Sequence, residues 1–208
     1  NPSAGIYLLH AFDTAGTSFS ACADYTGFIF TERLMNENYF FDEAGVEQAP
    51  MLGYKNFTDF DFRIATQKLD FTKNITQKIR FETGLKSSFV ENNSRFELQR
   101  NTAGTNLYYT DSAFLNKYIY KEQLFAGYVN VITTLKKITL QTGLRAEQTI
   151  IRGTSETNPY QLKRAYLNFF PNLSIDYRRS EKNNIQLSYC YRIDRPEYEQ
   201  SNQGVIFT

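Results

Sequence analysis

Few side chains in this sequence form a group that could perform acid–base, nucleophilic or metal chemistry. His10 is the single histidine, so neither histidine-based catalysis nor an ordinary zinc site is expected. Cys22 and Cys190 are too far apart for a metal-binding motif or a disulfide framework. Three carboxylates within residues 42–47 could bind a cation, but their spacing matches no calcium-binding loop. We therefore expect no enzyme activity, no cofactor and no metal site.

The charged side chains instead alternate with apolar ones, most clearly in residues 77–90 and 137–151. Every second residue of a β-strand points to the same face, so this alternation predicts strands with one apolar and one charged face. The charged face could line the lumen of a barrel, or it could be the solvated face of an ordinary half-exposed sheet. The residues predicted to face a lumen are Lys78, Arg80, Glu82, Lys86, Arg145 and Glu147.

The same alternation predicts an all-β chain of about eight long antiparallel strands. In residues 57–71 the apolar positions change parity after Ile64, and a β-bulge would explain the slip. The predicted strands cover residues 5–12, 18–33, 57–71, 77–90, 120–135 and 137–151, a segment through 173–177, and 184–192.

Composition excludes several other classes of protein. The 23 basic and 22 acidic side chains give a net charge of +1, which argues against a nucleic-acid partner. Phe (18) and Tyr (15) are abundant, yet the mean hydropathy is −0.48, because apolar residues are interleaved with polar ones. No apolar run approaches the roughly 20 residues of a membrane-spanning helix.

Predicted connections between the strands alternate between short and long. This rhythm is typical of a transmembrane β-barrel, with tight periplasmic turns and extended external loops. The short connections are 13–17, 72–76, 136–137 and 179–183, and the long ones are 34–56, 91–117 and 152–166.

Several of these segments also resemble strands of TonB-dependent outer-membrane receptors. QTGLRAE at 141–147, FPNLSIDY at 170–177 and IQLSYCYRIDRPEY at 185–198 are similar to three successive strands of that family, in the family's order. FETGLK at 81–86 is similar to an earlier strand. In the last of these motifs, Arg195-Pro196 is expected to end its strand, because proline cannot continue a central ladder.

The resemblance implies a wall segment of a barrel of roughly 22 strands, located in the outer membrane of a Gram-negative cell. Such receptors import large nutrients, for example a glycan or a ferric chelate. Their partners are outer-membrane lipid, a plug domain and TonB. Residues 1–208 are expected to form a single barrel segment without the plug, so plug and TonB would act through other parts of the protein. External loops bind the nutrient in such receptors, which makes Tyr108 and Tyr109 candidate contacts.

Two alternatives remain open at this point. The chain could be a soluble β-sandwich or lipocalin-like barrel that binds a ligand, or a small self-contained outer-membrane barrel. The direction of Leu85, Leu144 and Leu187 separates the first alternative from a membrane barrel, because these side chains meet either lipid or a dry core. Pairing of the first strand with the last would identify the small barrel.

Overall fold

The computed structural model describes residues 1–101, 107–156 and 161–193, and nearly all of them lie in one antiparallel β-sheet. The expectation of an all-β chain with eight long strands is confirmed, and a three-residue strand and one 3-10 turn are added. The elements are β1 (Ser3–Ala11), β2 (Ser18–Phe41), β3 (Glu47–Thr76), β4 (Ile79–Asn101), β5 (Tyr108–Thr110), η1 (Ser112–Phe114), β6 (Asn116–Leu135), β7 (Ile138–Ser155), β8 (Gln161–Arg178) and β9 (Asn184–Cys190).

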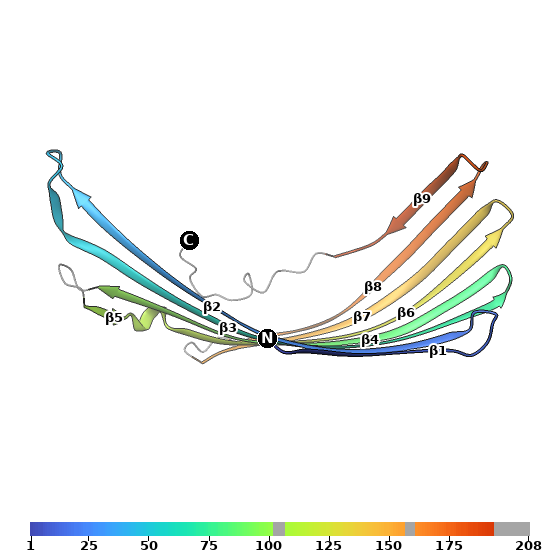
Figure 1. Ribbon diagram of the computed structural model, residues 1–208, viewed down its shortest axis with the longest axis horizontal. Coiled ribbons are helices and arrows are strands. Elements are labelled where there is room, and N and C mark those ends of the chain that lie inside the picture. Colours follow the sequence, from blue (N-terminus) through green and yellow to red (C-terminus); the bar gives the residue numbers. More distant parts are fainter. Residues whose placement is uncertain (102–106, 157–160, 194–208) are drawn as a thin grey trace.

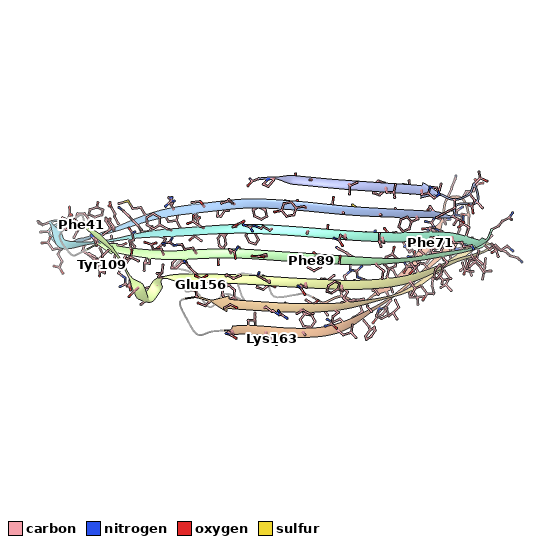
Figure 2. All side chains as sticks on the ribbon, turned by 90° about the horizontal axis from the view of Figure 1, so that it is seen from below. Phe41, Phe71, Phe89, Tyr109, Glu156 and Lys163 are labelled. Atoms are coloured by element: carbon pink, nitrogen blue, oxygen red, sulfur yellow. The ribbon has the colours of Figure 1, made fainter. Side chains whose placement is uncertain are left out.

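Each long strand pairs with the next one along the chain, in the order β1-β2-β3-β4-β6-β7-β8-β9, and β5 pairs with β4. The described sheet is therefore open, with β1 and β9 at its two edges. Figure 1 shows a strongly curved sheet, with the short turns gathered at one end and the β2–β3 hairpin reaching furthest at the other. Figure 2 shows Phe41 and Tyr109 at this long-hairpin end and Phe71 near the short-turn end.

Local chemistry closes the tight turns at the short-turn end. In the β1–β2 turn, the Thr17 backbone N–H donates to Asp13 Oδ1 at 2.9 Å. Hydrogen bonds from the Thr17 side chain and backbone hold the pKa of the Asp13 carboxyl below its ordinary value. The β6–β7 turn contains Lys136 with φ 52°, a left-handed conformation that lets two residues reverse the chain.

The three connections predicted to be long loops are largely strand, so this prediction was wrong. The β2–β3 connection shrinks to residues 42–46, where Asp42 Oδ1 accepts the backbone N–H groups of Ala44 and Val46 at 3.0 and 2.8 Å. Likewise, β4 runs on to Asn101, β7 runs on to Ser155, and β8 begins at Gln161. Backbone hydrogen bonds to the neighbouring strands hold a strand together whatever its side chains are. Where neither face is uniformly apolar, the sequence of a strand does not alternate between apolar and polar residues, so the strand cannot be recognised from that pattern.

The bulge predicted within residues 57–71 is also absent. Pairing of β3 with β4 keeps one register from Tyr54 opposite Arg100 to Asn74 opposite Arg80, and shifts only beyond Asn74. The change of parity is real: the apolar side chains of β3 lie on one face near the long-hairpin end and on the other face near the short turns.

The two faces of the sheet follow from the pairing registers, and we name them after two adjacent residues of β4. The Leu85 face carries Leu85 and the residues that continue its row across the sheet, and the Lys86 face is the opposite one. That row consists of Leu8, Ala21, Leu69, Leu85, Gly127, Ala146 and Phe169.

Burial is inverted relative to a soluble domain. The large side chains of the Leu85 face are exposed: Leu85 is 61% accessible, Leu144 45% and Leu187 67%. They do not converge on a dry core, as the soluble alternative required. Nearly all of the buried side chains lie on the Lys86 face; Asn101, on the Leu85 face, is an exception. The buried apolar residues of the Lys86 face are Leu98, Tyr118, Tyr120, Leu124 and Ala126.

Candidate functional site

The Leu85 face carries an apolar band next to the short turns. On β4 the band runs from Ile79 to Phe89, about 11 residues or roughly 36 Å of strand at the usual rise. A transmembrane strand of roughly this length, tilted by about 45°, gives the apolar height of about 25 Å found on membrane barrels. The band ends sharply, since the next residues on the same face are Glu91 on β4 and Arg152 on β7. The band therefore has the height and the exposure of a lipid-facing surface.

No helix formed by the described residues is long and apolar enough to cross a membrane. Within the same ranges, no three His, Cys, Asp or Glu side chains gather as a metal site would require.

Ion pairs line the Lys86 face at the level of the apolar band. Five of the six residues predicted to face a lumen are brought onto this face; the sixth, Lys78, lies in the two-residue β3–β4 turn. Arg80 Nη2 lies 2.7 Å from Glu82 Oε1, and Arg145 Nε lies 2.5 Å from Glu147 Oε1. Both pairs join residues i and i+2 of one strand, so they form a ladder of charge along the Lys86 face. The five residues on the face are Arg80, Glu82, Lys86, Arg145 and Glu147.

A tyrosine laid across a glycine ties three strands together within this ladder. Tyr128 on β6 is the cross-strand partner of Gly84, and Gly84 is in turn the partner of Asp70 on β3. The Tyr128 hydroxyl donates to Asp70 Oδ1 at 2.5 Å, and Lys68 Nζ lies 2.8 Å from Asp70 Oδ2. The ring can cross β4 because residue 84 has no side chain. Gly84 lies in the FETGLK segment, so this contact gives a structural reason for its glycine.

Adding a methyl group at Gly84 should therefore be costly. A Cβ atom there would lie 2.5 Å from Tyr128 Cε1 and 2.6 Å from the Leu69 carbonyl oxygen, which is backbone and cannot move away cheaply. We expect Gly84→Ala to lower the free energy of unfolding of the native protein in lipid vesicles by about 1–3 kcal/mol, as overpacking does. Urea titration followed by the β-sheet circular dichroism signal measures this change.

Gly127→Ala on the neighbouring strand is the matched control. A Cβ atom at Gly127 would be 3.3 Å from Leu85 Cδ2, the end of a flexible side chain on the Leu85 face, so little loss is expected. Equal effects of the two substitutions would contradict the role of Tyr128.

Beyond the apolar band, the Lys86 face becomes aromatic and tightly packed. Tyr118 and Tyr120 on β6 are 2% and 7% exposed. Asn92 on β4 and Thr149 on β7 are fully buried, and neither side chain has a hydrogen-bond partner among the described residues. Sequence reasoning missed this cluster. Its only signal was that Tyr118 and Tyr120 share the parity of Glu122, which lies on the Lys86 face.

The two candidate tyrosines of the external loop lie on opposite faces. Tyr108 pairs with Asn101 and lies on the Leu85 face, where the Lys55 ammonium is 3.8 Å from the ring centroid. Tyr109 pairs with Arg100, lies on the Lys86 face and is 54% exposed. Both belong to β5, which is anchored to β4 by the Thr110 hydroxyl donating to Glu97 at 2.8 Å.

Comparison with known proteins identifies what this sheet is similar to. Residues 10–208 match the sequence profile of the outer membrane protein beta-barrel family. No curated protein matches the sequence. Among solved structures, the ferric citrate transporter FecA in its unliganded form matches with a TM-score of 0.59 at 11% identity, over 86% of this chain and 25% of that one.

Two further solved structures share the fold. FpvA of P. aeruginosa, in complex with an iron pyoverdine, matches with a TM-score of 0.55 at 12% identity over 86% of this chain and 24% of that one. BauA, the ferric preacinetobactin receptor of Acinetobacter baumannii, matches with a TM-score of 0.52 at 12% identity, over 86% and 28%. The chain thus spans about a quarter of the length of each structure, and identities this low show a common fold alone.

Proposed function

Since the chain belongs to the outer membrane protein beta-barrel family and is located in the outer membrane, we propose that it forms part of the wall of a TonB-dependent receptor that imports a large nutrient. The observation that carries the proposal is the opposition of the two faces: an exposed apolar band on the Leu85 face and an ion-paired Lys86 face behind it. A wall between lipid and a polar passage needs this arrangement.

The fold of the matched receptors supports the same proposal. Three transporters and receptors whose names state ferric ligands contain a stretch of barrel like this one, each about four times as long as the matched region. We infer that the remaining strands of a barrel of roughly 22, the plug domain and the TonB contact belong to other parts of the protein. The role is transport rather than catalysis.

In this proposal the Lys86 face lines the lumen. Arg80, Glu82, Arg145 and Glu147 contact the plug or its surrounding water, and their pairing along each strand keeps charged groups satisfied inside the barrel. Lys78, in the periplasmic turn, lies at the mouth of the lumen. The Leu85 face meets lipid.

The nutrient is a ferric chelate or a glycan, and it first meets the external end of the sheet. Tyr109 is a candidate contact there, because it is exposed on the face that we assign to the lumen. Tyr108 would contact the nutrient only from outside the wall, since its ring packs beside Lys55 on the Leu85 face. An aromatic ring suits both kinds of nutrient, as it stacks on sugar rings and on aromatic chelators.

Growth on single nutrients tests the proposal. Strains with and without the native protein are compared on ferric chelates as the only iron source and on glycans as the only carbon source. We expect loss of the protein to abolish growth on at least one of them, and removal of TonB to have the same effect.

Conductance in planar bilayers is the second arm of the test. A plugged receptor should show no large steady conductance, whereas an open pore would conduct continuously. Steady conductance of the native protein, together with growth that does not depend on TonB, would overturn the proposal.

A further inference from the structure

A row of cations crosses the Leu85 face directly above the apolar band. Lys121 on β6 is the cross-strand partner of Arg152 on β7, and Arg152 is the partner of Lys163 on β8. All three side chains are exposed. Directly opposite residues have Cβ atoms about 4.5–5.5 Å apart, and like charges at that spacing repel one another. The sheet therefore places three positive charges side by side, where they repel one another.

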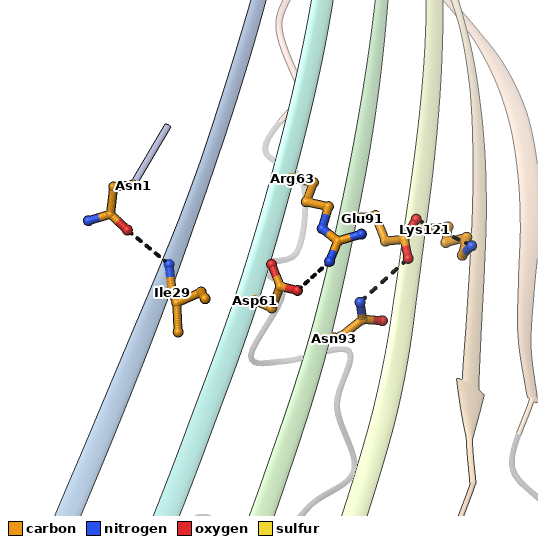
Figure 3. A network of polar contacts seen from close by, with 7 residues as sticks. All are labelled: Asn1, Ile29, Asp61, Arg63, Glu91, Asn93 and Lys121. Atoms are coloured by element: carbon orange, nitrogen blue, oxygen red, sulfur yellow. Dashed lines mark hydrogen bonds and ion pairs between the residues drawn. The ribbon is translucent and has the colours of Figure 1, made fainter. Parts of the chain in front are cut away.

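Carboxylates neutralise only one end of this row. Figure 3 shows Lys121 Nζ next to Glu91 at 3.3 Å. Arg63, the partner of Glu91 on β3, is bonded through Nη2 to Asp61 at 2.8 Å. Across the described ranges, no carboxylate lies within ion-pair distance of Arg152 or Lys163. The positive charge left on β7 and β8 is thus open to an anion from outside the sheet.

The depth of the row indicates which anion it meets. Ile150 and Ala165, the residues two positions below Arg152 and Lys163 on the same face, belong to the apolar band. Lipid headgroups lie immediately outside the hydrocarbon core, within a layer that brings a bilayer of about 30 Å to about 40–45 Å. Short turns mark the periplasmic end of such strands, so the row lies at the level of the outer-leaflet phosphates.

A hollow in the apolar band lies below the row. It is a groove of about 880 Å³, made by small residues where the neighbouring strands carry large ones. Its upper edge includes Gln148 and Leu167, each four residues from a cation of the row, about 13 Å along the strand. The small residues of the Leu85 face that line it are Ala21, Ala23, Ser87, Gly127 and Ala146.

We propose that Lys121, Arg152 and Lys163 bind a phosphate of an outer-leaflet lipid, one acyl chain of which lies against the groove. An Arg guanidinium binds phosphate through two parallel N–H donors, and the flanking Lys ammonium groups add point charges. The phosphate offsets the repulsion within the row, and the bound lipid fixes the strands at the membrane surface. This site depends on the outer-membrane position of the sheet and not on nutrient import.

Native mass spectrometry of the detergent-solubilised native protein tests the site, with bisphosphorylated lipid A as the probe. We expect one retained lipid, and binding weaker by about tenfold or more in Arg152→Gln/Lys163→Gln, because charge-assisted hydrogen bonds to phosphate are lost. The swap Arg152→Lys/Lys163→Arg keeps the charge and should restore most of the affinity. Heat-modifiable electrophoretic mobility shows that each variant is folded.

The control Arg164→Gln/Lys182→Gln removes the same charge elsewhere. Arg164 is next to Lys163 but lies on the Lys86 face, and Lys182 lies in the β8–β9 turn. Equal weakening in both double variants would overturn the proposal, because it would indicate general charge attraction. Undiminished binding of dephosphorylated lipid A would also overturn it, as would full displacement by inorganic phosphate, which would indicate a free-phosphate site.

Discussion

Ala21→Arg is expected to lower the free energy of unfolding of the native protein in lipid vesicles by about 2–4 kcal/mol, the cost of an arginine at the bilayer midplane of a barrel. Ala21 lies in the same row as Leu85, and Leu85 is midway between the start of β4 and the end of the apolar band on that strand. A guanidinium there must either leave water or pull water and headgroups into the hydrocarbon core. Urea titration followed by circular dichroism gives the difference.

Ser20→Arg, one residue away, is the matched control. Ser20 lies on the Lys86 face, where its hydroxyl donates to Asp70 Oδ2 at 3.5 Å. An arginine there would reach the same carboxylate, so the loss should stay below about 1 kcal/mol, as for most exposed substitutions. If Ser20→Arg were the more damaging of the two, the assignment of the faces would be inverted.

Tyr118→Ala is expected to lower the free energy of unfolding by about 3–5 kcal/mol, the usual cost of deleting a fully buried aromatic side chain. Tyr118 is 2% exposed, and its ring fills the space above Gly153, where a Cβ atom would clash with the phenol. The same urea titration measures the loss. Tyr118→Phe keeps the ring and should cost less than about 1.5 kcal/mol, the value of one hydrogen bond.

Tyr109→Ala makes the same substitution at an exposed tyrosine of the external region. Because Tyr109 is 54% exposed, its loss should change stability by less than about 0.5 kcal/mol. A large loss at Tyr109 and none at Tyr118 would contradict the packing described for this end of the sheet.

Strands near the short turns could be predicted from sequence because lipid on one side and a polar surface on the other impose strict alternation. Leu85 and Leu144 show this directly: each is apolar, exposed and flanked by residues of the opposite face. The prediction failed where that asymmetry ends. Beyond Phe89, polar side chains occupy the Leu85 face and aromatic ones fill the Lys86 face, so long strands looked like loops.

The parity change on β3 is the clearest case of this limit. Phe60 and Phe62 stack at 5.9 Å between ring centroids on the Lys86 face, while Leu69 and Phe71 lie on the Leu85 face. A one-residue bulge shifts the apolar residues to the other parity. The same shift appears in the sequence when a regular strand passes from a region with one apolar face to a region where the other face is apolar. Only the pairing register distinguishes them, and it shows that the strand leaves the apolar band without a break.

The contacts of the candidate site were beyond sequence reasoning because they join residues of different strands. The charged residues of β4 and β7 could be assigned to one face by parity alone. The crossing of Tyr128 over Gly84 to Asp70 could not, since it depends on the registers of two strand pairs. The part of the IQLSYCYRIDRPEY motif beyond residue 193, including the strand end expected at Arg195-Pro196, lies outside the described residues.

Accessibility of spin labels along β7 tests the account most directly. Labels are placed one at a time at residues 138–150 of the native protein in lipid vesicles, and their collisions with oxygen and with a water-soluble nickel chelate are measured. We expect oxygen, which concentrates in lipid, to dominate at the even positions, such as Leu140 and Leu144, and not at the odd positions, such as Gln141 and Arg145. Oxygen maxima at the odd positions, or no alternation at all, would contradict a sheet that turns its Leu85 face to lipid.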